Sequence, residues 1–134
     1  MRLILASIAM LALLAGCKAD SASYQIGGSR DHALTLLRTK PYPWSKAWEL
    51  EAVVSNSPVC LRRHRLKDAP EADPEVAVHA PELGAFILRQ GKRWYVAEMG
   101  TCGLQEFKTP PPEPGELIGS FRTKDGALRF VAKP

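Results

Sequence analysis

Cysteine residues are the side chains of this chain with the clearest potential for chemistry. Cys17 ends an apolar N-terminal run, which leaves Cys60 and Cys102 as an even pair. In an oxidising compartment such a pair predicts a disulfide, closing a loop of roughly 43 residues and stabilising the fold by ~4 kcal/mol on the chain-entropy model. The alternative is a reactive thiol assisted by His64 or His79, which would need protection from oxidation in that compartment.

The second feature is a basic run over residues 62–67, with the sequence Arg-Arg-His-Arg-Leu-Lys. On a strand, Arg63 and Arg65 would share one face, and Arg62 and His64 the other. One interpretation is an edge strand that its cations protect against edge-to-edge pairing. The other is contact with an anion, a glycan or an acidic partner through Arg62, Arg63, Arg65 and Lys67. The acidic loop 68–74 could also fold back and neutralise the run.

Recognisable catalytic motifs are missing from the sequence. It has no nucleophile elbow, phosphate-binding loop or dinucleotide fingerprint. Its three histidines do not have the spacing of a zinc-binding helix, and a carboxylate pair such as Glu98 and Glu106 is a weak signal. Residues 100–103, Gly-Thr-Cys-Gly, are best interpreted as a tight bend that holds a disulfide cysteine. We therefore predict no catalytic residues, no metal and no cofactor, although a small hydrolase of cell-wall or lipid substrates stays a minor alternative.

The N-terminus has the layout of a secretory signal peptide, with Arg2 followed by an apolar run over residues 3–15. This run is well below the ~20 residues that a membrane-spanning helix requires. Its end, Leu14-Ala15-Gly16-Cys17, closely resembles the lipobox of bacterial lipoproteins. The resemblance covers residues 1–18 only. It implies removal of residues 1–16 and lipidation of Cys17.

Lipidation would hold the mature protein at a membrane, since two or more acyl chains give stable anchoring. By analogy with lipoprotein sorting in Gram-negative bacteria, Lys18 after the cysteine suggests the periplasmic face of the outer membrane. The alternative is ordinary cleavage after residues 21–23, which would discard Cys17 and leave a soluble periplasmic protein.

The small polar residues 17–29 predict a flexible tether between the lipid and one folded domain over residues 30–134. The formal net charge of +4 is too mild to indicate a nucleic-acid partner, although it permits contact with anionic lipids or an acidic protein.

Short strands separated by turns are the main structural signal. Two hairpins are predicted, one over 84–99 around Gln-Gly-Lys and one over 117–132 around Asp125-Gly126. Further strands are expected at 32–38, 59–66 and 75–79. Residues 48–54 alternate as in a strand, which we favour, although Ser45 could cap a helix there. Residues 109–115, Thr-Pro-Pro-Pro-Glu-Pro-Gly, should form an extended loop. We predict a mainly β fold, a small antiparallel sandwich or barrel with one disulfide and at most one short helix.

Aromatic residues should mostly lie in the core of so small a β-domain. The exception is the segment from Tyr42 to Trp44, which is held between prolines and could be an exposed contact for a ligand or partner. Together these features indicate a lipid-anchored binding or scaffold module of the cell envelope, whose partner is an envelope protein or a glycan. An inhibitor or immunity protein against an envelope-directed hydrolase is the alternative. That alternative is a fold-level analogy with lysozyme-inhibiting lipoproteins.

Overall fold

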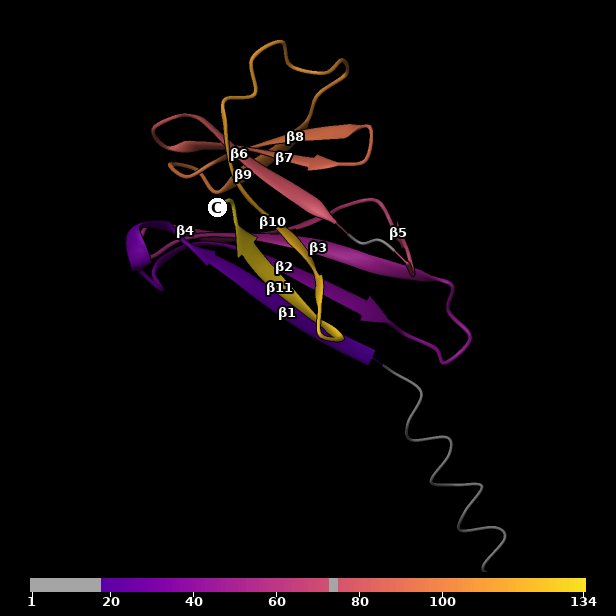
Figure 1. The fold of residues 1–134 in the computed structure, drawn as a ribbon. Coiled ribbons are helices and arrows are strands. Elements are labelled where there is room, and N and C mark those ends of the chain that lie inside the picture. The colour runs from indigo at the N-terminus through magenta and orange to yellow at the C-terminus, as the bar shows by residue number, and fades with distance from the viewer. Residues whose placement is uncertain (1–17, 73–74) are drawn as a thin grey trace, which may run out of the picture.

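A computed structural model describes residues 18–72 and 75–134, and the predicted signal peptide and Cys17 lie outside these residues. The described chain is mainly β and contains no α-helix (Figure 1). It therefore holds no helix that could span a membrane. Its elements, in chain order, are β1 (Lys18–Gln25), the 3-10 turn η1 (Ile26–Gly28), β2 (His32–Lys40), β3 (Ala47–Asn56), β4 (Cys60–Arg65), β5 (Ala69–Pro70), β6 (Val76–Glu82), β7 (Ala85–Gln90), β8 (Arg93–Glu98), β9 (Gly103–Glu106), β10 (Glu116–Lys124) and β11 (Ala127–Ala132).

These strands form two antiparallel sheets that are not closed into a barrel. The first has the order β1-β2-β3-β4, with β5 paired to β3, and the second has the order β11-β10-β6-β7-β8-β9. The sheets lie in two layers, with β11 beside β1 (Figure 1). The predicted antiparallel β fold with one disulfide is confirmed.

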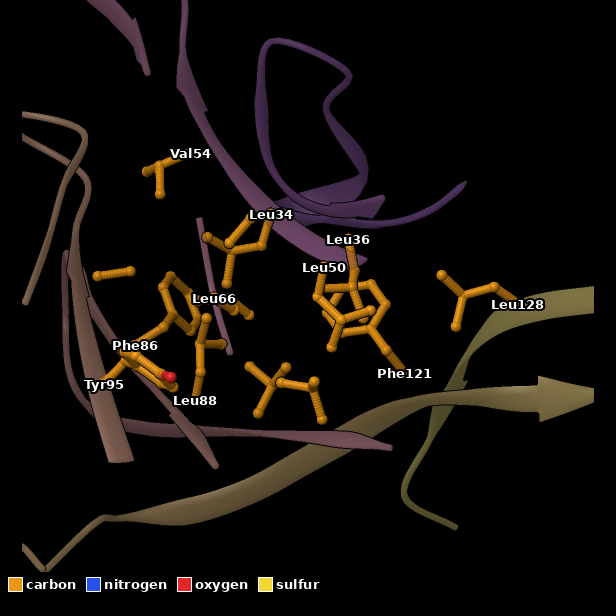
Figure 2. Packing of buried hydrophobic residues seen from close by; sticks show 14 of the residues in the cluster. Leu34, Leu36, Leu50, Val54, Leu66, Phe86, Leu88, Tyr95, Phe121 and Leu128 are labelled. Carbon is orange, nitrogen blue, oxygen red and sulfur yellow. The ribbon is translucent and has the colours of Figure 1, made fainter. Parts of the chain in front are cut away.

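The core lies between the two layers and takes residues from both (Figure 2). Leu36, Leu50 and Val54 come from the first sheet, and Phe121 and Val78 from the second, each at most 2 % exposed. Alternation explains the arrangement, because every second residue of a strand points to the same face. Residues 48–54 therefore belong to strand β3, not to a helix.

Both predicted hairpins are present, as β7–β8 and β10–β11. The β10–β11 turn uses Asp125 and Gly126 with φ of 54° and 80°. Positive φ at both turn positions is the geometry that Asp-Gly favours, because it matches the twist of the flanking strands. The short strands β5 and β9 were not predicted.

The flexible tether predicted for residues 17–29 is wrong over its described part. Residues 18–25 form strand β1, which pairs with β2 from Lys18 opposite Lys40 to Gln25 opposite Ala33. The folded domain therefore includes residues 18–25 and does not begin near residue 30. Small polar residues gave a weak strand signal, and the pairing is supported by inward contacts of Asp20 and Tyr24 that depend on distant parts of the chain.

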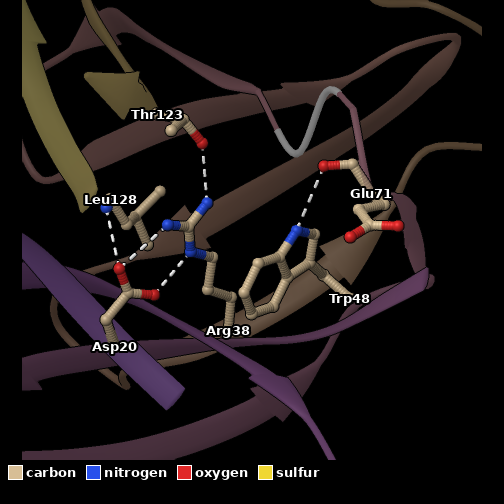
Figure 3. Close-up of polar contacts among 6 residues, drawn as sticks. All are labelled: Asp20, Arg38, Trp48, Glu71, Thr123 and Leu128. Atoms are coloured by element: carbon tan, nitrogen blue, oxygen red, sulfur yellow. Dashed lines mark hydrogen bonds and ion pairs between the residues drawn. The ribbon is translucent and has the colours of Figure 1, made fainter. Parts of the chain in front are cut away.

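Asp20 is the centre of a polar network that joins the edge strands β1 and β11 (Figure 3). Its carboxylate accepts two hydrogen bonds from the Arg38 guanidinium, at 2.5 and 2.9 Å, and one from the backbone N–H of Leu128 at 2.8 Å. Arg38 also donates to Thr123 Oγ1 at 2.7 Å. Arg38 is only 3 % exposed, so its charge depends on these partners.

The opposite pair of edges, β4 and β9, is joined by the disulfide. Cys60 lies at the start of β4, and Cys102 lies immediately before β9, with the two Cα atoms 5.9 Å apart. Each of these two pairs of edge strands is thus joined by a connection between the sheets. We call these the Asp20 clasp and the disulfide clasp.

Trp48 packs beside the Asp20 clasp, between two buried cations. The Arg38 guanidinium lies 4.3 Å and the Lys40 ammonium 4.7 Å from its ring centroid. Its indole N–H donates to the backbone oxygen of Glu71 at 3.3 Å, and the carboxylate of Glu71 forms an ion pair with Lys40. The inner face of the first sheet is therefore apolar at one end and polar at the other.

Candidate functional site

The basic run forms β4, and β4 is an edge strand, as one interpretation predicted. Arg63 lies 3.7 Å from Glu51, and Arg65 lies 3.5 Å from Glu49 on the neighbouring strand β3. Arg65 also donates to Asp68 at 2.7 Å, so the acidic loop does fold back. That hydrogen bond raises the pKa of Arg65. Two of the four proposed anion contacts thus already face carboxylates.

The other two cations of the run face different places. Arg62 lines a polar cleft of 270 Å³ together with His64 and Glu98. His64 is held by a 2.7 Å hydrogen bond between Nε2 and the backbone oxygen of Cys102, which orients it toward the disulfide clasp. Lys67 lines a separate cleft. The structure therefore does not gather the four cations into one anion site.

The cysteine chemistry is structural, because Cys60 and Cys102 form the predicted disulfide. Neither is available as a thiol nucleophile near His64 or His79. Cys102 is fully buried and has a positive φ of 57°, in agreement with the tight bend predicted at residues 100–103.

The other candidate acid, base and metal groups are dispersed. His79 contacts the backbone oxygen of Gly115 at 3.2 Å, and Glu106 pairs with Arg93 at 2.8 Å. Glu98 instead accepts a long hydrogen bond of 3.4 Å from Thr101. Within residues 18–72 and 75–134 no group of three or more His, Cys, Asp or Glu side chains could hold a metal ion.

A cleft of 560 Å³ with mixed charge opens between the chain after β4 and the β7–β8 turn. Two of its four cations have partners: Arg93 pairs with Glu106, and Arg89 donates to the backbone oxygen of Gly91 at 3.0 Å and stacks 5.0 Å from the Trp94 ring. Asp68 and Glu75 also line it. The lining of this cleft therefore carries charges of both signs.

Tyr42 and Trp44 are 54 % and 73 % exposed, so the exposure predicted for this segment is confirmed. Their rings stack with centroids 5.1 Å apart and planes 8° apart. Ser45 closes the turn, because its backbone N–H donates to the Tyr42 oxygen at 3.1 Å and its hydroxyl accepts from the Tyr42 N–H at 3.2 Å. A partner contact at this turn stays a prediction.

An apolar cleft of 490 Å³ opens between the sheets at the end where β1 finishes. Its wall contains Tyr24, Phe86, Met99 and Ile118, which come from β1, β7, the end of β8 and β10. Leu83, in the β6–β7 turn, lies at its lip and is fully exposed. Residues from many separate segments of the chain build this cleft, listed in full as Tyr24, Ile26, His32, Asn56, Ala80, Glu82, Leu83, Gly84, Phe86, Met99 and Ile118.

Sequence reasoning missed this apolar cleft, because its residues are distant along the chain and look like ordinary core residues. One signal was present: Leu83 is a large apolar residue in a turn, immediately before Gly84, where a polar residue is usual. Asn56 and Met99, which both line this cleft, are connected: the side-chain amide of Asn56 donates a hydrogen bond to the backbone oxygen of Met99 at 2.8 Å.

Comparisons with protein-family models, with curated proteins and with solved structures found no match to this chain.

Proposed function

We propose that this protein is a lipid-anchored binding module of the bacterial cell envelope, located at the periplasmic face of a Gram-negative outer membrane. The single observation that carries the proposal is the apolar cleft. The lipobox-like sequence ending at Cys17 and a disulfide suited to an oxidising compartment support the location. The cleft and the anchor lie at opposite ends of β1, since Lys18 starts the strand and Tyr24 lines the cleft.

The lining of the cleft favours a ligand with an apolar chain and one polar end. Its volume of 490 Å³ falls within the range of about 300–1,000 Å³ typical of small-ligand sites. The wall is aromatic and aliphatic, whereas His32 and Glu82 stand at the rim and are exposed. An acyl chain from an envelope lipid has this chemistry. A glycan or protein partner has less support from this cleft and stays a prediction.

Replacement of Ile118 by aspartate is expected to abolish acyl binding in the cleft, because the new carboxylate would lie in an apolar wall. The full lipidated chain would be reconstituted in vesicles with a photoactivatable fatty acid. Cross-linked peptides would then be mapped by mass spectrometry. We expect adducts near Phe86 and Met99 in the native chain and at least a tenfold loss in Ile118→Asp.

Leu61→Asp provides the matched control, because Leu61 is 59 % exposed on β4 and does not line the apolar cleft. Its adducts should equal those of the native chain. Unchanged labelling of Ile118→Asp, with retained folding by circular dichroism, would show that the cleft is not the acyl site.

The proposed lipid anchor at Cys17 can be tested separately from the apolar cleft. Cys17→Ser is expected to abolish incorporation of a labelled fatty acid and to prevent leader removal at residue 16, since the thiol is the proposed lipid carrier. Metabolic labelling followed by mass spectrometry of the N-terminal peptide measures both effects. A native N-terminus at residues 22–24 without lipid would instead indicate ordinary signal-peptide cleavage.

An inhibitor of an envelope-directed hydrolase is the second candidate, and one observation favours it. The loop between β9 and β10, residues 107–115, protrudes from the second sheet (Figure 1). It carries the exposed Glu113 among prolines. An inhibitor would contact its enzyme through this loop, so loss of hydrolase activity on adding the protein, reversed by loop substitution, would favour this function over ligand binding in the cleft.

A further inference from the structure

The turn between β2 and β3 lies at the anchor end of the sandwich. Lys40, the last residue of β2, is paired with Lys18, the first residue of β1, and Tyr42 follows two positions later. Figure 1 shows this turn extending beside the start of β1. The apolar cleft lies at the opposite ends of these strands, because Tyr24, His32 and Asn56 line it. Because β1 begins at Lys18, only one peptide unit separates the sheet from Cys17, a span of about 3.8 Å.

A lipid on Cys17 would therefore hold this end of the domain directly at a membrane surface. The stacked rings of Tyr42 and Trp44 are the large exposed aromatic groups of this turn. Tyrosine and tryptophan concentrate at membrane–water interfaces, because an amphipathic ring satisfies both the apolar and the polar side of that region. The exposed cations Lys18 and Lys46 flank the turn and suit anionic headgroups.

We propose that Tyr42 and Trp44 insert into the headgroup region of the membrane that holds the Cys17 lipid. This inference rests on the lipid anchor of the proposed function. The partner of the two aromatic rings is a phospholipid surface. The turn is preorganised for this contact by Pro41, Pro43 and the Ser45 hydrogen bonds, so little conformational entropy is lost on insertion. Attachment at two points fixes the orientation of the domain and directs the apolar cleft toward the periplasm.

Depth-dependent fluorescence quenching tests this contact. The full lipidated chain would be reconstituted in vesicles of phosphatidylethanolamine and phosphatidylglycerol carrying bromine near the headgroup. Trp48 is buried and Trp94 is half-buried on the second sheet, so quenching should come from Trp44. We expect Trp44→Phe to reduce the quenched fraction about fivefold, with lipidation and vesicle association unchanged.

A tryptophan at the opposite end is the control. Leu61 is exposed on β4, pairs with Ser55 near the end remote from Lys18, and does not line the apolar cleft, so Leu61→Trp introduced into Trp44→Phe should not restore quenching. Restored quenching, or equal quenching with and without Trp44, would overturn the insertion. If mass spectrometry finds no lipid on Cys17, both proposals fail. If the lipid is present and Trp44 is unquenched, the insertion alone is wrong, and a protein contact would explain the exposed pair.

Discussion

Replacement of Asp20 by alanine is expected to destabilise the domain by about 3 kcal/mol, because it leaves the Arg38 charge buried without its counter-ion. Arg38 is 3 % exposed, whereas Asp20 is 32 % exposed, so the loss falls mainly on the buried arginine. The backbone N–H of Leu128 would lose its acceptor as well. Chemical denaturation followed by tryptophan fluorescence measures the change in the free energy of unfolding.

Removal of both charges should be less harmful than removal of one. Arg38→Met combined with Asp20→Ala replaces a buried ion pair by apolar groups, so we expect the double variant to recover part of the stability lost in Asp20→Ala. The Arg38→Met single variant provides the reference. If the double variant is less stable than Asp20→Ala by as much as Arg38→Met alone destabilises the native chain, the two residues act independently.

The same carboxylate gives the protein a pH dependence with a defined sign. Partial desolvation on its own raises the pKa of Asp20, but hydrogen bonds from Arg38 and Leu128 and the charge of Arg38 together lower that pKa below its ordinary value. A lowered folded-state pKa contributes stability above the unfolded pKa of about 4, and this stability is lost as pH falls through the folded pKa. Asp20→Asn should therefore lose less stability than the native chain on acidification below about pH 4.

Loss of the disulfide clasp is expected to have the largest effect, about 4 kcal/mol. The 42-residue separation of Cys60 and Cys102 gives this magnitude on the chain-entropy model, because reduction frees a long loop in the unfolded chain. Cys60→Ala with Cys102→Ala should lower the denaturation midpoint, and reductant should have the same effect on the native chain.

The Leu61→Asp variant is the control for the disulfide experiment, since Leu61 lies on the same edge strand and keeps both cysteines. It should denature close to the native midpoint and should keep its sensitivity to reductant. A reductant-insensitive native chain would contradict the stabilising role of the disulfide.

The hairpins could be predicted from sequence because their information is local. Asp125-Gly126 specifies a turn by itself, and alternating apolar residues on either side specify the register. The pairing of Cys60 with Cys102 followed from a count of cysteines in an oxidising compartment. Exposure of Tyr42 and Trp44 followed from their position in the proline-containing segment Pro41-Tyr42-Pro43-Trp44.

Strand β1 could not be predicted in the same way, because its evidence lies elsewhere in the chain. Arg38 and Lys40 continue the inward alternation of Leu34 and Leu36 on β2, so they require an acidic partner within the fold. Asp20 supplies it for Arg38 from a segment with little strand propensity of its own. A cation at an inward position of a predicted strand thus indicates that another strand, not recognised from the sequence, supplies an acidic partner.

The candidate site was less accessible to sequence reasoning than the fold. An anion site was one of two interpretations of the basic run, yet Glu49 and Glu51 on β3 form ion pairs with Arg65 and Arg63, and only the pairing of β3 with β4 reveals this. The apolar cleft has no motif, because it arises where strand ends of two sheets meet.

The two clasps also imply an order of assembly. In the first sheet β1 to β4 each pair with the next strand along the chain, and β6 to β9 do the same in the second, so these meanders need only short loop closures. Asp20 and Leu128, by contrast, are 108 residues apart, and the disulfide joins one meander to the other. Because the N-terminal part of a chain is synthesised first, the first meander can form before the second has been made. The two connections between the sheets therefore form last, after the β10–β11 hairpin has folded.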